Sequence, residues 1–493
     1  MNAILPDLLA NRARLDPDAV AIEEVATGRT VSYRELDARA GRACTLLARR
    51  GIGPGDRVAI LCRNRLAFWE LLFACARAGA ILAPLNWRMP AGELDLLIRD
   101  AEPGLLIYDE AFHQAAAALE TQPPLLGLAD YEAEAECLPE SGERCPAAAE
   151  TWYLLYTSGT TGRPKGVIYT FEMAVANLLN ITAATGLRKG DAIPAFLPNF
   201  HTAGINLHAL PALLTGGRLL LLESYDVDVL ASLLAGARAD LLFGVPFIYQ
   251  ELIDHPLLGL APLAQVRHWG CGGAPLPDRL AERYREVGIR LCNGMGMTET
   301  GPTALLMSPE DAWERLGSVG KPQLLCHARI VDAAGRPVAQ GEVGELVFAG
   351  PGVTPGYWRN EEATRAAFTA DGALLSGDLA WCDPDGFYYI VGRRKEMYIS
   401  GGENVYPAEV EKVLTSHPAV SDAAVVAVPD ERWGEVGQAF VQVAPGALLP
   451  DCSDLQSYCR SRLAAYKIPR AFAVVNDFPR TSAGKIQKHL LLS

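Results

Sequence analysis

The chain has 493 residues, more than one hydrophobic core usually serves, so we expect two or more domains. Half of the residues are apolar and 21% are charged, as in an ordinary globular enzyme. The 58 acidic residues outnumber the 44 basic ones, which gives a formal net charge of −14, and no Lys/Arg cluster stands out. Nucleic acid and an anionic membrane surface are therefore not expected as partners.

The N-terminal segment does not have the pattern of a secretory signal, because Asp7, Arg12 and Arg14 interrupt its apolar residues. No window approaches 18 uninterrupted apolar residues, so no membrane span is predicted. The 11 cysteines are odd in number, scattered, and never in C-x-x-C pairs. This usage indicates reduced thiols in a cytoplasmic protein without a zinc site.

The first part of the sequence predicts helices that alternate with strands. Ser32 and Glu35 form a capping box at the start of a helix, and Gly51 ends it. A strand, a helix and a second strand are predicted at residues 56–62, 66–78 and 80–85. This βαβ spacing indicates a parallel sheet and an α/β fold. The segment 121–150, rich in Pro, Ala and Glu, is predicted to be a surface connection.

Residues 151–166 read TWYLLYTSGTTGRPKG and change character within one residue. The apolar and aromatic half, 151–157, predicts a short buried strand. In the polar half, three glycines let backbone N–H groups approach an anion, and hydroxyls and a lysine add donors. This combination suits a nucleoside polyphosphate, and the predicted contacts are Thr157, Ser158, Gly159, Thr160, Thr161, Gly162 and Lys165.

The stretch differs from a Walker A loop, because Lys165 does not follow a glycine and Gly166 takes the Ser/Thr position. A polar turn after a strand, common in α/β proteins, is the alternative interpretation. The motif YTSGTTGRPKG resembles the phosphate-binding signature of the adenylate-forming superfamily: acyl- and aryl-CoA ligases, adenylation domains of peptide synthetases, and beetle luciferases. The resemblance implies a large N-terminal domain with parallel sheets (1–394) and a small mobile α+β domain (395–493).

A helix is predicted over 171–185, and the sequence LPNFHTAG follows at 197–204. A histidine in such an apolar stretch is by default structural. In the superfamily a histidine after Phe or Tyr lines the carboxylate pocket, so the resemblance assigns His201 to this pocket and to catalysis. The other pocket residues that it implies are Ala203, Gly204, Phe247, Cys271 and Met295.

The stretch 201–217 contains no Lys, Arg, Asp or Glu. An ionised group at the far end of the substrate would lose its hydration there without a partner. The sequence therefore predicts a monocarboxylic acid with a neutral, largely apolar body, aromatic or medium-chain. Malonate, succinate and o-succinylbenzoate are expected to be poor substrates. Asn206 and His208 are the polar exceptions, and either could accept a hydroxyl or keto group if it faces inward.

Two further motifs, CGGAP (271–275) and NGMGMTET (293–300), resemble the superfamily's adenine-side loop and its second strongest motif. The Thr298 hydroxyl can hold the α-phosphate and the attacking carboxylate together, and Glu299 can bind Mg²⁺. Met295 departs from the tyrosine that stacks on adenine in most members, although a thioether can also cover a ring face. The implied nucleotide contacts are Gly273, Ala274, Pro275, Asn293, Gly294, Met295, Gly296 and Met297.

Residues 374–411 carry three further matches. The resemblance implies that Asp378 accepts hydrogen bonds from the ribose hydroxyls and that Arg393 contacts ribose or phosphate. It also implies that the C-terminal domain rotates about Lys395, since hinges lie at the ends of elements. Without the other motifs, these three residues would be interpreted as surface charges near a turn.

In the C-terminal part, Pro407 begins a predicted helix. Two strands and a second helix are predicted at residues 422–430, 438–444 and 454–464. The final motif, PRTSAGKI, resembles the superfamily's terminal motif, whose lysine reaches back over the active site. The resemblance therefore assigns catalysis to Lys485, at the bridging and carboxylate oxygens.

CoA is the expected acceptor of the acyl group, because no carrier-protein domain follows Lys485. Weaker resemblances concern the pantetheine tunnel of aryl-CoA ligases and one contact to the CoA nucleotide. The implied CoA-binding residues are Gly401, Gly402, Glu403, Trp433, Tyr466 and Arg470, together with Arg88 in the N-terminal domain. The co-substrates and cofactor implied are thus ATP, CoA and Mg²⁺, and a homodimer is one assembly that we consider.

Several alternatives remain open. A stand-alone adenylation enzyme could load a carrier protein, although an amino-acid version would need a carboxylate for the α-amino group, and the run around His201 supplies none. A luciferase-type oxygenase would require an unusual substrate. An inactive AMP-binding regulator is disfavoured by the joint presence of Thr298, Glu299, Asp378, Arg393 and Lys485. The chain looks most like short bacterial ligases for feruloyl, benzoyl and medium-chain acyl groups, but Ala203 replaces a tyrosine of some hydroxycinnamate ligases.

Overall fold

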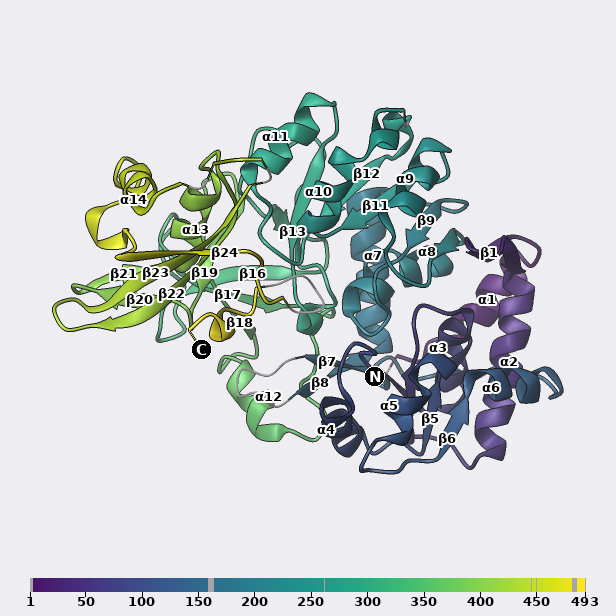
Figure 1. Ribbon diagram of the computed structural model, residues 1–493. Coiled ribbons are helices and arrows are strands. Elements are labelled where there is room, and N and C mark those ends of the chain that lie inside the picture. The colour runs from purple at the N-terminus through teal and green to yellow at the C-terminus, as the bar shows by residue number, and fades with distance from the viewer. Residues whose placement is uncertain are drawn as a thin grey trace.

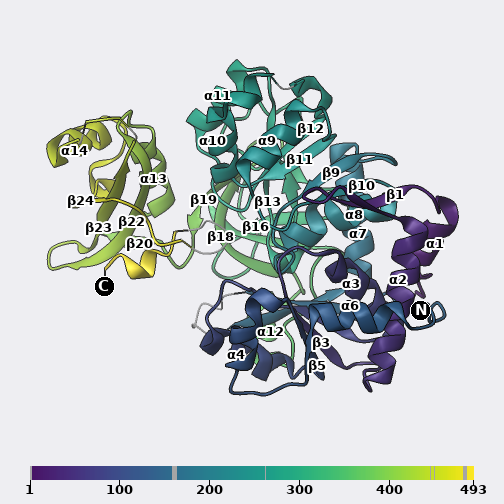
Figure 2. The same cartoon turned by 45° about the vertical axis from the view of Figure 1, so that its right-hand side comes forward.

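The computed structural model describes residues 3–157, 164–260, 262–444, 446–448, 450–480 and 486–492. These residues form an α/β fold with five sheets, which confirms the fold class expected from the βαβ pattern. Figures 1 and 2 show a large N-terminal part, coloured purple to green, and a small yellow-green C-terminal part beside it. Within the described ranges, no helix combines the length and apolarity that crossing a membrane requires.

The first sheet has six strands in the order β6-β5-β3-β4-β7-β8. Their bounds are β3 (Arg57–Leu61), β4 (Ile81–Pro84), β5 (Leu105–Tyr108), β6 (Leu125–Gly127), β7 (Thr151–Thr157) and β8 (Lys165–Thr170). Neighbouring strands are parallel except β7 and β8, which are antiparallel. The helices of this region are α1 (Leu8–Leu15), α2 (Tyr33–Arg49), α3 (Leu66–Ala78), α4 (Ala91–Ala101), α5 (His113–Ala117), α6 (Leu128–Glu136) and α7 (Phe171–Thr185).

The ends of the first helices follow from local sequence. At the start of α2, the Ser32 hydroxyl accepts a hydrogen bond from the Glu35 amide at 3.2 Å. After its end, Gly51 has a φ of 78°, a conformation that glycine adopts without strain. The βαβ unit is also confirmed, because α3 connects the parallel strands β3 and β4.

We predicted that the segment 121–150 is a surface connection, but it also contains regular, partly buried structure. It contains the edge strand β6 and the helix α6. Leu128, Tyr131 and Ala135 are buried on one face of α6, and the Tyr131 hydroxyl donates to Glu70 at 3.0 Å. Three apolar positions at helical spacing suffice for docking, but they are inconspicuous among the Ala and Glu residues around them.

The second sheet has the order β2-β1-β10-β9 and the third the order β11-β12-β13-β14-β15. The bounds are β1 (Val20–Glu24), β2 (Arg29–Ser32), β9 (Ala192–Ala195), β10 (Arg218–Leu221), β11 (Leu241–Gly244), β12 (His268–Cys271), β13 (Leu291–Met295), β14 (Leu305–Leu306) and β15 (Lys321–Pro322). The helices are α8 (Ala209–Thr215), α9 (Val227–Ala235), α10 (Pro246–Asp254) and α11 (Asp278–Glu286). Strands β11, β12 and β13 are parallel, so their carboxyl ends share one edge.

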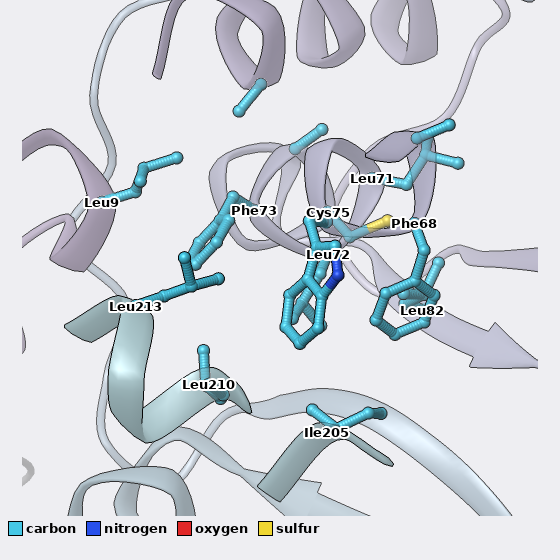
Figure 3. Packing of buried hydrophobic residues seen from close by; sticks show 14 of the residues in the cluster. Leu9, Phe68, Leu71, Leu72, Phe73, Cys75, Leu82, Ile205, Leu210 and Leu213 are labelled. Atoms are coloured by element: carbon cyan, nitrogen blue, oxygen red, sulfur yellow. The ribbon is translucent and has the colours of Figure 1, made fainter. Parts of the chain in front are cut away.

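The largest core lies between the first and second sheets. Figure 3 shows Phe73 and other side chains of α3 facing Leu210 and Leu213 of α8, with Leu9 of α1 at the side. Most residues of α3 are buried, which fits its apolar sequence on all faces. This helix therefore joins the two sheets into one body that supports the strands of the site.

The fourth sheet is antiparallel and has the order β16-β17-β18-β19, and the fifth contains the remaining strands. The bounds are β16 (His327–Val331), β17 (Gly344–Ala349), β18 (Leu374–Cys382), β19 (Tyr388–Arg393), β20 (Tyr398–Ser400), β21 (Glu403–Val405), β22 (Val420–Asp430), β23 (Gly434–Val443) and β24 (Ala471–Val475). The helices are α12 (Glu361–Ala367), α13 (Pro407–Thr415) and α14 (Cys452–Arg460). The fifth sheet with α13 and α14 is the small C-terminal part in Figures 1 and 2.

The C-terminal part has its own core, to which Tyr398, Val425 and Ile468 belong. It contacts the larger part through α13, which packs beside β19. An ion pair also joins the two parts: Nζ of Lys412 on α13 lies 2.8 Å from Oδ2 of Asp278 on α11. Both side chains are partly exposed, at 58% and 35% respectively.

Candidate active site

The predicted phosphate-binding stretch is a β-hairpin. Strands β7 and β8 pair with Thr157 opposite Lys165, so these two residues lie side by side where the turn begins and ends. The remaining predicted phosphate contacts, Ser158, Gly159, Thr160, Thr161 and Gly162, lie outside the described residues. The predicted strand 151–157 matches β7 at both ends.

The predicted metal ligand Glu299 lies in a short helical turn, η5 (Thr298–Thr300), and is 6% exposed. The turn is held by Thr300, whose hydroxyl accepts from the Met297 amide at 2.9 Å and donates to the Met297 carbonyl at 3.1 Å. Thr298 is half-buried beside Glu299. Oε1 of Glu299 accepts a hydrogen bond from the Tyr357 hydroxyl at 2.8 Å.

Tyr357 was not among the predicted site residues. It belongs to the loop before α12 and stands 58 positions from Glu299 in the sequence. The only local signal is the tripeptide Gly356-Tyr357-Trp358, which has no helical or strand periodicity. Its role becomes visible only through the contact with Glu299.

The predicted nucleotide loops lie at the carboxyl ends of parallel strands, where ligands of open α/β sheets bind. Cys271 at the end of β12 pairs with Asn293 of β13, so both loops start side by side. The residues after β12, Gly273, Ala274 and Pro275, are exposed or half-buried. Those around the end of β13, Gly294, Met295, Gly296 and Met297, are likewise partly accessible.

Glycine is required at one of these positions for steric reasons. A Cβ atom on Gly296 would collide with the carbonyl oxygen of Pro302. The Asn293 side chain is occupied, because it donates to the Ser318 carbonyl at 2.9 Å. Met295 packs against the core that includes Leu305 and Ala380, so its thioether lies at the border between this core and the loop.

Asp378, predicted as a ribose contact, and Arg393, predicted as a ribose or phosphate contact, form a pair. They stand opposite each other on β18 and β19, and Nε of Arg393 lies 2.8 Å from Oδ1 of Asp378. Arg393 also donates to the Ser376 carbonyl at 3.2 Å. Asp378 is 7% exposed, whereas the Arg393 side chain is 45% exposed. The pair therefore presents its cationic side to solvent.

The predicted acid pocket begins at a π-helical turn, η2 (Ala203–Leu207), a form that is frequent at functional sites. A Cβ on Gly204 would collide with the Pro198 carbonyl, which explains the glycine there. His201 and Ala203 are half-buried, and the His201 ring lies 4.5 Å from that of Phe200. These residues remain candidates for the pocket wall.

Two other predicted pocket residues differ in their exposure. The Cys271 side chain is fully buried in the core of the third sheet, and this burial raises the pKa of its thiol. Phe247 is 58% exposed at the start of α10, near Tyr225. The Cys271 side chain thus lies in the core beneath the candidate site, and the Phe247 side chain lies on the protein surface.

The two polar residues of the apolar run do not face a pocket opening. Asn206 is fully buried, accepts from the Tyr153 hydroxyl at 2.7 Å and donates to Thr202 at 3.1 Å. His208 is 4% exposed and lies 6.2 Å, ring to ring, from buried His268. Burial, together with His268, lowers the pKa of His208 to about 3, so this imidazole is neutral at physiological pH.

The predicted CoA residues of the C-terminal part form a cluster around Trp433. Gly401 packs directly beneath the indole and donates to the Trp433 carbonyl at 2.9 Å, and the Arg470 guanidinium lies 5.7 Å from the ring centroid. Gly402 and Glu403 are exposed next to Gly401, and Tyr466 is half-buried.

The predicted N-terminal CoA contact lies elsewhere. The Arg88 guanidinium is 4.8 Å from the Trp87 ring and 6.0 Å from the Phe200 ring. Because Phe200 contacts His201, the structure brings Arg88 close to the candidate acid pocket.

The predicted hinge Lys395 is exposed in the turn between β19 and β20. Lys485 lies outside the described residues. Three residues further on, Nζ of Lys488 contacts Glu396 and lies 2.8 Å from Oε1 of Glu411 on α13. The segment that follows Lys485 is thus fixed to the C-terminal part, right next to the predicted hinge.

Comparisons with known proteins agree with these motifs. The family described as AMP-binding enzyme matches residues 9–358, and its C-terminal domain family matches residues 409–485. A feruloyl-CoA synthase from Amycolatopsis sp is 40% identical to this chain over 97% of it and 96% of its own length.

Two solved proteins have closely similar structures. ATP-bound MatB from Rhodopseudomonas palustris has a TM-score of 0.91 at 32% identity, covering 99% of this chain and 98% of its own, and apo MatB has a TM-score of 0.82. O-succinylbenzoate coenzyme A synthetase from Bacillus subtilis, in complex with ATP and magnesium ion, has a TM-score of 0.90 at 32% identity and covers all of both chains.

Proposed function

We propose that this chain, which belongs to the AMP-binding enzyme family, is an ATP-dependent carboxylic acid–CoA ligase of the AMP-forming type. It converts the acid into an acyl-AMP with release of pyrophosphate and then transfers the acyl group to CoA. The observation that carries the proposal is the meeting of Lys165 and Glu299 at Tyr357, because it brings the phosphate-loop cation and the metal carboxylate to one place. Feruloyl-CoA synthase, the 40% identical relative, acts in the same chemical class.

The first step joins two anions. An oxygen of the substrate carboxylate attacks the α-phosphorus of ATP, and the bond from that phosphorus to the bridging oxygen of pyrophosphate breaks. Positioning and charge neutralisation therefore matter more than proton transfer. We assign Lys165, Thr157 and the motif residues between them in the sequence to the departing pyrophosphate, and Lys485 to the bridging and carboxylate oxygens.

Magnesium fits the donor set at Glu299. This carboxylate is a hard oxygen donor, and its Oε1 is occupied by Tyr357, which leaves Oε2 for a metal. The described residues contain no group of three or more metal-ligating side chains, but Mg²⁺ needs only one or two carboxylates when phosphates and water complete its shell. Bound there, Mg²⁺ would offset phosphate charge.

In the second step the CoA sulfur attacks the acyl carbon and AMP leaves with the former carboxylate oxygen. We assign the C-terminal cluster around Trp433, with Arg88, to CoA. We also propose that residues 1–394 and 395–493 are the two domains and that the second rotates about Lys395 between the steps. The higher TM-score with ATP-bound than with apo MatB supports an arrangement close to the ATP-bound form.

The acid that we propose has a neutral body, aromatic or medium-chain. In the stretch 201–217 the only ionisable side chains are His201 and His208, and His208 is buried and neutral, so the stretch itself supplies no Lys or Arg to pair with an ω-carboxylate. The relation to feruloyl-CoA synthase at 40% identity agrees with this, whereas a 2-succinylbenzoate–CoA ligase, whose named substrate carries a second carboxylate, is 36% identical. A cytoplasmic location fits the 11 cysteines, all of which are free thiols.

The test is a CoA-dependent assay over a panel of acids, with pyrophosphate exchange as the readout of the first step. We expect kcat/KM for a neutral aryl acid to exceed that for its ω-carboxylate analogue by at least about 10-fold, since an unpaired buried carboxylate is costly. A preference for the dicarboxylate would contradict the neutral pocket. Exchange without thioester formation would instead favour a carrier-protein loader.

A further inference from the structure

Tyr357 lies where three segments meet: β8, the turn η5 and the loop before α12. Backbone hydrogen bonds set their register, because Trp358 donates to the Gly166 carbonyl at 2.7 Å and Thr354 donates to the Glu299 carbonyl at 2.8 Å. The position of Tyr357 relative to the hairpin and to η5 is therefore fixed by main-chain contacts on either side of it.

The Tyr357 side chain contacts both charged groups of the proposed ATP site. Its hydroxyl donates to Oε1 of Glu299 at 2.8 Å, and Nζ of Lys165 lies 4.9 Å from the centroid of its ring. A cation over a tyrosine ring is attracted by the electrons of the ring face. One side chain thus orients a cation and a carboxylate that come from distant parts of the sequence.

The direction of this hydrogen bond follows from its partners, because a phenol O–H donates and a carboxylate oxygen accepts. A protonated phenol that occupies one carboxylate oxygen restricts the rotation of the carboxylate, and partners of this kind tune metal affinity.

We propose that Tyr357 is the positioning residue of the MgATP site. Its hydroxyl holds the Glu299 carboxylate so that Oε2 is left for the metal, and its ring holds the Lys165 ammonium for the phosphates. This role rests on the proposed function, and it concerns metal-bound nucleotide rather than the acid or CoA.

The test is Tyr357→Phe, which keeps the ring beside Lys165 and removes the bond to Glu299. We expect the Mg²⁺ concentration for half-maximal pyrophosphate exchange to rise about 10-fold or more, as for other lost partners of metal ligands. Calorimetric binding of ATP, titrated at several Mg²⁺ concentrations without acid, should show the same shift. Binding of AMP without metal should stay at the wild-type value.

A matched control is Tyr131→Phe. The Tyr131 hydroxyl donates to Oε2 of Glu70 at 3.0 Å, which is the same kind of bond to a carboxylate with no predicted ligand. This variant should keep the wild-type Mg²⁺ dependence. Tyr357→Leu, which also removes the ring from Lys165, should weaken ATP binding even at saturating Mg²⁺, while Tyr357→Phe should not.

Two outcomes would overturn the proposal. One is a wild-type Mg²⁺ dependence in Tyr357→Phe. The other is an equal loss of metal-free AMP binding and of MgATP binding, which would mean that the residue only supports the fold. If the wild-type protein catalyses no exchange with any acid, the proposed function fails, and the calorimetric titration still decides the role of Tyr357.

Discussion

The ion pair between Asp378 and Arg393 connects two residues that two separate motifs assigned to the nucleotide. We predict that Asp378→Asn raises the KM for ATP about 10-fold, because a charged hydrogen-bond acceptor for the ribose and the partner of Arg393 are both lost. The KM for CoA should change little. Steady-state kinetics with each substrate varied in turn checks this.

Asp371→Asn is the control for that experiment, since Asp371 pairs with Arg329 on the same sheet, at an exposed site without a predicted ligand. This variant should have wild-type constants. An unchanged KM for ATP in Asp378→Asn would remove Asp378 from the nucleotide site.

Motifs predicted which residues carry charge in the site but not which of them touch each other. Lys165 follows from the chemistry of its Gly- and Thr-rich stretch, whereas Glu299 and Asp378 were implied by the resemblance to the adenylate-forming superfamily. The bond from Tyr357 to Glu299 spans 58 positions and the pair of Asp378 with Arg393 depends on strand register. Both are set by tertiary packing, which local periodicity does not encode.

Among the elements, β12 and the start of α8 bring two buried histidines together, His268 in β12 and His208 just before α8. No hydrogen-bond partner exists for either ring nitrogen of His268 or for Nδ1 of His208 within the described residues. Burial lowers the pKa of His268 to about 4, and burial with His268 lowers that of His208 to about 3. Both values lie below the ordinary 6.5, so the unfolded chain takes up these protons first as the pH falls.

We therefore predict that the contribution of these two histidines to stability is constant above about pH 7 and decreases as the pH falls from about 6.5 towards 4, by up to about 1.4 kcal/mol per pH unit for each histidine. The midpoint of urea denaturation at pH 7 and pH 5 measures this. His268→Phe should reduce the difference between the two midpoints, whereas the exposed His327→Asn should not. An equal pH dependence in His268→Phe would contradict the assignment.

Element boundaries were predicted well where local rules decide them. The helix predicted over 66–78 has the bounds of α3, and the strand predicted over 80–85 is β4 with one residue fewer at each end. Apolar periodicity and terminal residues suffice there. Helix α6 was not predicted, and the Asn206 side chain is hydrogen-bonded to Tyr153 instead of being available to a substrate. Packing against the rest of the fold determines the helix and this hydrogen bond.

For the molecule as a whole, the two proposed half-reactions should separate by mutation. We predict that Lys485→Ala nearly abolishes pyrophosphate exchange, because it removes charge at the reacting centre, but leaves thioester formation from presynthesised acyl-AMP largely intact.

Lys395→Pro should have the reverse effect: pyrophosphate exchange survives and thioester formation is lost, since proline fixes φ at the proposed hinge. Equal losses in both half-reactions would refute the rotating-domain mechanism.

The contacts of Lys488 with Glu396 and Glu411 indicate which residues would move together in the proposed rotation. The residues after Lys485 are fastened to α13 and to the neighbour of Lys395, both in the C-terminal part. A movement about the hinge would thus carry the terminal motif with it.

The ion pair between Lys412 and Asp278 is the direct charge contact described between the two parts, and it is partly exposed. Pairs of this kind contribute about 0–1 kcal/mol, close to thermal energy. This ion pair therefore gives the orientation no large free-energy advantage, and to that extent the population of the orientation can follow small differences in affinity between successive ligands. Binding of nucleotide and then of thiol would select each domain orientation in turn. The protein would then need no stored strain to return to the first orientation.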